Sequence, residues 1–113
     1  GEPLDARSGA EREARRSGLE KLRAALWQHA ATHEGRFPAR DNPAIAMELW
    51  GVPGAPGLTF LYVADRRAEE EGRLLAYEPQ IEGAERQVLL TNGMFGTMDD
   101  ISIDQALRSK EGE

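Results

Sequence analysis

The chain has 113 residues, of which 40% are hydrophobic and 30% charged, a length and balance that favour one globular domain with one modest core. Its formal net charge of −6 argues against a general nucleic-acid role, because binding phosphate backbones requires a basic face. The absence of cysteine excludes disulfides, thiolate metal ligands and a cysteine nucleophile. No apolar run approaches the ~20 residues of a membrane-spanning helix.

An amphipathic helix is predicted from about Glu11 to His33. Apolar positions recur there at spacings of three or four residues and form one face, made of Leu19, Leu22, Leu26, Ala30 and His33. Gly35 is the expected helix stop. Residues 1–10 should form a flexible lead-in. The segment before Leu19 has almost no large apolar residue, so it should project into solvent or continue a helix that begins elsewhere.

Basic residues are concentrated in the first quarter of the chain: Arg7, Arg12, Arg15, Arg16, Lys21 and Arg23. Acidic residues are interleaved with them, namely Glu11, Glu13 and Glu20. This pattern indicates a solvated helix face of mixed sign, with an anion-binding patch as the alternative. The spacing of Glu11 and Arg15 favours an ion pair within the helix. We expect Leu22 and Leu26 to be buried against a sheet, and Arg12, Arg15 and Arg16 to be exposed.

An antiparallel sheet is predicted after a Pro/Gly-rich excursion over residues 39–57. Within the excursion, Ile45 to Trp50 should form one helical turn with Ile45, Leu49 and Trp50 packed inward. Strands are expected at residues 58–63, 73–77, 86–91 and 94–98, and Asn92-Gly93 is a strong hairpin signal before the last of them.

A short C-terminal helix should begin near Ile103, where Ser102 and Gln105 have capping-box spacing. The predicted fold is α+β, with the long N-terminal helix packed on a three- or four-stranded antiparallel sheet. Residues 11–108 form the single domain, and residues 109–113 should be a frayed tail.

Two groups of side chains resemble metal ligands. His29 and His33 are four residues apart, but the segment lacks the glutamate of a zinc-protease helix, and two ligands are too few. Asp99, Asp100 and Asp104 lie together, and Ser102 and Glu111 fall at further positions of a calcium loop, but Gln105 occupies the position that requires glycine. We interpret the histidines as the edge of the apolar face and the aspartates as helix-capping residues. No zinc, calcium or other cofactor is expected, and a chelator should leave the melting temperature unchanged.

Catalytic signatures are missing from the remaining polar residues. The run Glu69-Glu70-Glu71 is expected in a solvated loop, which offers no apolar pocket to separate carboxyl pKa values. The serines (Ser8, Ser17, Ser102 and Ser109) lack the context of a nucleophile elbow. Trp27 and Trp50 are predicted as packing residues, with a recognition surface as the alternative. The sequence therefore favours a protein that is not an enzyme.

The corner Glu34-Gly35-Arg36-Phe37-Pro38 resembles the helix-to-sheet corner in the periplasmic domain of type II secretion pseudopilins and related type IV pilin-like proteins. The resemblance covers residues 11–98 and rests also on the order of elements. The stretches Leu74-Leu75-Ala76-Tyr77-Glu78-Pro79 and Val88-Leu89-Leu90-Thr91-Asn92-Gly93 are similar to small pilin-like domains of bacterial membrane-anchored proteins. Two family features find no match here: the hydrophobic helix after a prepilin cleavage site, which we expect upstream of Gly1, and the C-terminal calcium loop.

The resemblance implies a non-catalytic, extracytoplasmic assembly domain, held at the membrane by a segment upstream of Gly1. In that hypothesis the charged first turns of the helix meet neighbouring subunits. The alternative is a partner-binding domain of a single-span membrane protein, which would use the excursion and the charged loop at residues 65–72. Both hypotheses imply protein partners or self-association, and neither implies nucleic acid.

Overall fold

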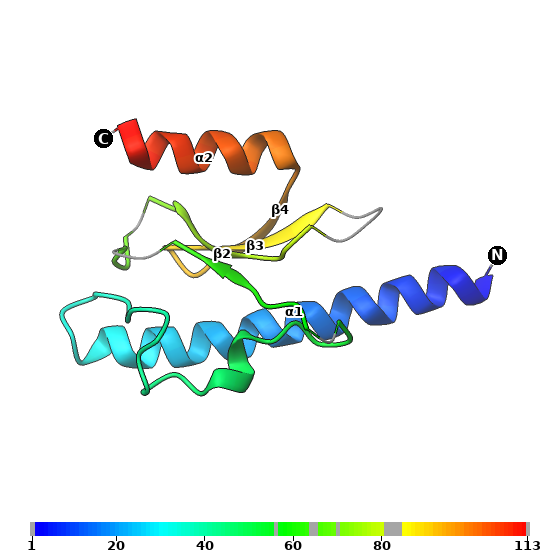
Figure 1. Cartoon of the computed structure of the whole chain (residues 1–113), viewed down its shortest axis with the longest axis horizontal. Coiled ribbons are helices and arrows are strands. Elements are labelled where there is room, and N and C mark those ends of the chain that lie inside the picture. The colour runs from blue at the N-terminus through cyan, green and yellow to red at the C-terminus, as the bar shows by residue number, and fades with distance from the viewer. Residues whose placement is uncertain (1, 56, 64–65, 70, 81–84, 113) are drawn as a thin grey trace.

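The computed structural model describes residues 2–55, 57–63, 66–69, 71–80 and 85–112 and confirms the predicted α+β architecture. Four strands form one antiparallel sheet in the order β1-β2-β3-β4, and a helix lies on each face of it (Figure 1). In chain order the elements are α1 (Glu2–Ala31), the 3-10 turn η1 (Met47–Trp50), β1 (Leu61–Tyr62), β2 (Leu74–Tyr77), β3 (Arg86–Leu90), β4 (Phe95–Met98) and α2 (Asp100–Gly112).

Helix α1 begins earlier than the sequence predicted. Its first residue is Glu2, so residues 2–10 are helical where an irregular lead-in was expected. The apolar pattern missed this segment because that part of α1 runs past the end of the sheet, where no buried stripe is required (Figure 1). The other expectation for this segment, that it projects from the domain, is therefore confirmed.

The end of α1 is a tight reversal. Ala31 is the last helical residue, and the N–H of Gly35 donates to the carbonyl of Ala30 at 2.9 Å. Glu34 and Gly35 have φ values of 59° and 83°, the left-handed conformation typical of a helix stop. Gly35 thus stops the helix as predicted. The assignment of His33 to the buried face is wrong, because the chain has already left the helix and His33 is exposed.

The first core layer lies between α1 and the sheet. Leu19, Leu22 and Leu26 have no exposed surface, which confirms the predicted stripe. They belong to one buried cluster with side chains from the excursion and the strands: Phe37, Ile45, Trp50, Val52, Phe60, Leu75, Ala76 and Leu89. Burial of a leucine contributes roughly 1.5–3 kcal/mol, so this stripe is the main attachment of α1.

The Pro/Gly-rich excursion packs against α1. Gly18 makes this possible, since a Cβ at that position would lie 2.8 Å from the ring of Pro53. The predicted helical turn is present as η1, and Ile45 and Trp50 are buried. The N–H of Val52 donates to the carbonyl of Leu58, and that of Phe60 donates to Trp50. Residues 58–60 therefore pair with the excursion, which shortens β1 from the predicted 58–63 to two residues.

The second core layer lies between the sheet and α2. Its buried residues are Val63, Leu74, Tyr77, Val88 and Ile103. All of β2 is consequently buried, which explains why its sequence does not alternate between apolar and polar residues. The register of β2 against β3 shifts between Leu74 and Ala76, and this bulge turns both Leu75 and Ala76 toward α1.

The capping residue of α2 is Asp99. The N–H of Ser102 donates to Asp99 Oδ1 at 2.8 Å, and this bond is the main reason that the pKa of Asp99 lies below its ordinary value. The predicted capping box of Ser102 and Gln105 is wrong, because the helix begins at Asp100 and both residues lie inside it. Helix α2 continues to Gly112, through most of the segment expected to fray.

Candidate functional site

The corner after α1 is tied to the segment before β2 by a short antiparallel ladder. The N–H of Ala68 donates to Gly35 at 2.7 Å, and the N–H of Phe37 donates to Arg66 at 3.2 Å. Between these bonds, Arg36 and Arg67 form an isolated antiparallel bridge. The ladder therefore places three arginines in one region, although Arg36 is far from the other two in the sequence.

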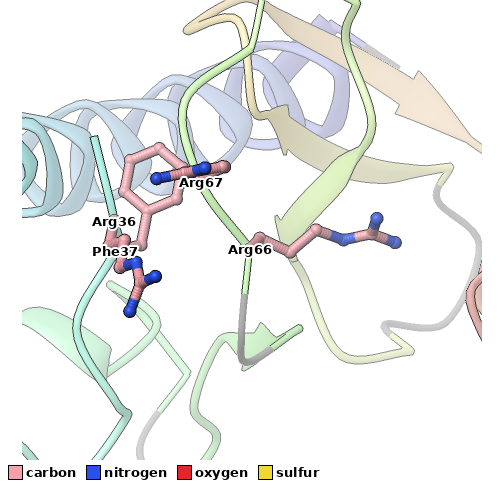
Figure 2. Close-up of a pocket in the computed structure, with 4 residues that line it drawn as sticks. All are labelled: Arg36, Phe37, Arg66 and Arg67. Carbon is pink, nitrogen blue, oxygen red and sulfur yellow. The ribbon is translucent and has the colours of Figure 1, made fainter. Parts of the chain in front are cut away.

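These residues line a cleft of about 430 Å³ that we call the arginine cleft: Arg36, Phe37, Arg66 and Arg67. Figure 2 shows the side chains of Arg36, Phe37 and Arg67 grouped together, whereas Arg66 extends away from them. Phe37 is buried and its ring packs on Trp27, with 4.6 Å between the ring centroids. The cleft thus joins an aromatic wall anchored in the core to guanidinium groups at the surface.

The positive charge of the arginine cleft is not neutralised within the described residues. The salt bridges found within the described residues are made by Arg15, Arg73 and Arg86, which are not cleft residues. Arg67 donates to the carbonyl of Glu34 at 3.3 Å, and the buried Nε of Arg66 has no hydrogen-bond partner. Guanidinium groups stay charged at any physiological pH. Within the described residues, the cleft is therefore a site of unpaired positive charge, on a chain whose net charge is −6.

A buried ion pair links α1 to the sheet. Arg15 Nε donates to Glu78 Oε2 at 2.8 Å, and the two side chains retain only 11% and 1% exposure. Glu78 also accepts hydrogen bonds from the backbone and the side chain of Gln87, and the Gln87 amide donates to the carbonyl of Arg12. The carboxylate is thus satisfied by several donors, and the cluster fixes the position of α1 along the sheet.

The expectation that Arg15 is exposed is wrong. Arg15 lies four residues before Leu19, so it extends the buried stripe by one turn and reaches the sheet. Its partner is Glu78, which immediately follows β2, and not the Glu11 predicted from helix spacing. Arg12 and Arg16 are exposed as expected.

Two other basic residues of α1 contact the β3–β4 hairpin. Arg16 and Arg23 lie over the ring of Phe95, at 4.2 Å and 4.7 Å from its centroid. Arg23 also donates to the carbonyl of Gly93 at 2.8 Å. These cations hold α1 against the β3–β4 hairpin, while Lys21 remains exposed. The side chain of Arg7 lies outside the described part of the structure.

His29 and His33 stack on one another, with 3.8 Å between ring centroids and 6° between ring planes. His33 Nδ1 lies 2.8 Å from the carbonyl oxygen of His29; a carbonyl only accepts, so we assign a proton to this nitrogen. Within the described residues, no three histidine or acidic side chains are grouped so as to hold a metal ion. Partial desolvation, and then the charge of His33, lower the pKa of His29 from its ordinary value.

An NMR titration of the histidine rings should give His29 a pKa below the ordinary ~6.5. Because the folded-state pKa is lowered, protonation of His29 opposes folding. The stability that the neutral ring contributes is complete above the unfolded-state pKa and is lost as the pH falls from there through the lowered folded-state pKa. His33→Ala should raise the pKa of His29, since it removes the neighbouring charge and exposes the ring. A pKa of His29 that is unchanged in His33→Ala would contradict the stacked geometry. Gln28→Ala, on the same turn, is the control.

The acidic residues considered as calcium ligands or as part of the charged loop lie at or near the surface where they are described, and three of them make local contacts. Asp99 caps α2, Asp100 accepts from Arg86 at 3.0 Å, and Asp104 is exposed. Glu69 pairs with Arg73 at 3.6 Å, Glu71 is exposed, and Glu70 lies outside the described residues. The side chain of Glu111 lies outside them as well. The capping interpretation is thus confirmed for Asp99.

The tryptophans and serines occupy places consistent with packing and helix surfaces. Trp50 is buried and meets the ring of Tyr62 at 5.0 Å, and Trp27 is half-buried against Phe37. Both therefore pack as predicted. Ser17 and Ser102 are exposed on their helices, and the side chains of Ser8 and Ser109 are not among those described.

Sequence reasoning missed the arginine cleft. Arg36 was noted only as part of the corner motif, and Arg66-Arg67 only as part of a charged loop. The adjacent arginines were the available signal, but no local pattern indicated that the corner would pair with them.

Comparison with protein-family models, with curated proteins and with solved structures finds no match to this chain.

Proposed function

We propose that this chain is a non-catalytic extracytoplasmic assembly domain, similar to a pseudopilin subunit, in which α1 is the element that meets neighbouring subunits. The observation that carries the proposal is the projection of α1 past the end of the sheet (Figure 1). A helix of 30 residues is about 45 Å long, close to the 48 Å length of the whole molecule. The helix is thus the longest surface that the chain presents to a partner.

The first turn of α1 whose side chains are described lies on the surface. Residues 11–14 are exposed, and Arg15 is the first residue of α1 whose side chain is described as buried. Isolated helical segments shorter than ~12–15 residues are marginal in water, and Gly9 in the interior weakens this one further. Contact with another chain would stabilise these turns, and interleaved charges such as Arg12 and Glu13 suit a polar subunit interface.

The fold gives further support to the proposal. A long helix followed by an antiparallel meander is the order of elements on which the resemblance to pseudopilins rests. Both faces of the sheet are covered by helices, so α1 and the sheet edges remain as extended surfaces for association (Figure 1). Neither helix has, among its described residues, a stretch apolar and long enough to cross a bilayer.

A partner-binding domain is the second candidate function, and the arginine cleft favours it. A cleft with an aromatic wall, and with positive charge that no described residue pairs, is suited to one defined contact with a partner. The two functions are compatible if the partner is another component of the same assembly.

Cysteine cross-linking distinguishes these functions, because the chain has no cysteine of its own. Glu13→Cys places one thiol on the exposed projecting part of α1, and Asp104→Cys places one on the exposed surface of α2 as a matched control. In cells that produce the natural protein, we expect Glu13→Cys to give cross-linked copies of this chain and Asp104→Cys to give none. Adducts with a different protein alone would support the partner-binding domain. Failure of both Glu13→Cys and Ser17→Cys to cross-link would contradict an assembly role for α1.

A further inference from the structure

We propose that the arginine cleft binds a carboxylate-bearing segment of a protein partner, an inference that rests on the assembly function and specifies the chemistry of one contact. The cleft combines three features within the described residues. Its guanidinium groups have no ion-pair partner among the described residues, one wall is an aromatic ring, and the lining residue Arg66, whose side chain extends away from the others, has a buried Nε without an acceptor (Figure 2). The guanidinium groups point to an occupant with oxygen acceptors, and the ring points to an apolar contact beside them.

The unpaired donors define what the occupant must supply. Arg36 has no hydrogen bond from its side chain to the described residues, and Arg67 uses one nitrogen on the carbonyl of Glu34. The planar fork of a guanidinium matches a carboxylate in two parallel hydrogen bonds, which are stronger than neutral ones. Elsewhere in the chain, Arg15 and Arg86 each donate one hydrogen bond to a carboxylate.

The wall made by Phe37 favours a peptide over a simple ion. Phe37 lines the cleft with the 7% of its surface that stays exposed, and Trp27 supports its ring, so it offers a small, rigid apolar contact next to the charges. A cleft of about 430 Å³ exceeds the space that one small anion occupies, and it accommodates a side chain with its neighbours. An acidic residue beside an apolar one satisfies both parts of the cleft.

The charge of the whole chain argues against a polyanion. A net charge of −6 repels nucleic acid at long range, and nucleic-acid binding needs a continuous basic track along which phosphates can lie. The cleft is instead a small positive site within an acidic molecule. A short acidic segment presents its carboxylates close to the cleft. Their attraction to the arginines acts within the ~8–10 Å of a Debye length, whereas the charges on the rest of the surface are screened.

The ladder explains how the site stays preorganised. The bridge between Arg36 and Arg67 holds their backbones side by side, and the left-handed turn at Glu34 and Gly35 sets the direction in which the corner leaves α1. The side chains therefore start from a fixed backbone, which reduces the entropy lost when a ligand binds.

The test uses the whole chain and two blocked peptides, one with glutamates on both sides of a leucine and one with glutamines in their place. Calorimetry should detect binding of the glutamate peptide that weakens as salt is added, and no binding of the glutamine peptide. Arg36→Ala and Arg67→Ala should each weaken binding at least about tenfold, the usual effect of losing a charge-assisted hydrogen bond. Arg36→Lys should also weaken it, because lysine keeps the charge but lacks the fork. Arg108→Ala, an exposed arginine on α2, should leave binding unchanged.

Backbone amide NMR shifts locate the peptide and show that the variants are folded. We expect shifts at residues 35–37 and 66–68, and unshifted signals in α2. Absence of binding, equal binding by the two arginine-to-alanine variants and the original chain, or inorganic phosphate binding as tightly as the glutamate peptide would each overturn the inference. If the glutamate peptide does not bind at the cleft while Glu13→Cys still cross-links copies of the chain, the assembly function stands without this contact. If the peptide binds at the cleft while no α1 cross-link forms, the contact stands and the assembly role of α1 falls.

Discussion

Leu26→Ala is expected to lower the free energy of unfolding by about 2–5 kcal/mol. Leu26 has no exposed surface and lies in the cluster that joins α1 to the sheet. Its truncation removes buried apolar area and leaves a cavity between the helix and the sheet. Because small domains have only ~5–15 kcal/mol of stability in total, this single change removes a large share of it.

Urea denaturation followed by circular dichroism measures the effect, and Gln28→Ala is the matched control. Gln28 is exposed two positions further along α1, so its replacement should change the free energy of unfolding by no more than about 0.5 kcal/mol. A small effect of Leu26→Ala in the monomer, accompanied by weaker self-association in sedimentation, would contradict the packed helix and would instead indicate that α1 is a stalk.

Arg15→Ala is expected to destabilise the chain by about 3–5 kcal/mol, as much as a core truncation. The variant leaves the carboxylate of Glu78, which is 1% exposed, without its only described cationic partner. The donors from Gln87 remain, but they are neutral and do not replace the charge. The cost comes from the uncompensated buried charge and not from the strength of the original ion pair.

A double-mutant cycle with Glu78→Ala separates these contributions. If the main cost is the orphaned carboxylate, Arg15→Ala/Glu78→Ala should be less destabilised than the sum of the two single variants. Arg12→Ala is the control, because Arg12 is an exposed arginine one turn away whose backbone carbonyl, and not its side chain, joins the cluster. Equal stabilities of Arg15→Ala and Arg12→Ala would show that the pair is effectively solvated.

The predictable part of the fold is the part governed by local pattern. The stripe of Leu19, Leu22 and Leu26 has helical period, and the Asn92-Gly93 turn connects the last two strands, so both were read correctly. The boundary of β1 was wrong because residues 58–60 pair with the excursion, a partnership that no local pattern specifies. The start of α1 was wrong because a projecting helix lacks an apolar stripe.

The candidate site was less predictable, because its residues come together through tertiary contacts. Arg15 was misassigned since charge alone suggests exposure; its burial depends on Glu78, which lies far along the chain. The arginine cleft depends on the ladder between the corner and the segment before β2. A pair of adjacent arginines indicates a local basic group, but only the paired backbones show that Arg36 joins it.

The attachment of α1 through distant contacts has a consequence for the order of folding. Arg15 and Glu78 are 63 residues apart, Arg23 and Gly93 are 70 apart, and Gln87 reaches Arg12 across 75. Closing such loops costs more chain entropy than forming the β3–β4 hairpin, whose strands are neighbours in sequence. The meander and α2 should therefore assemble first and α1 should dock late. A contact made after the transition state slows unfolding without hastening folding, so Leu26→Ala should mainly accelerate the unfolding rate.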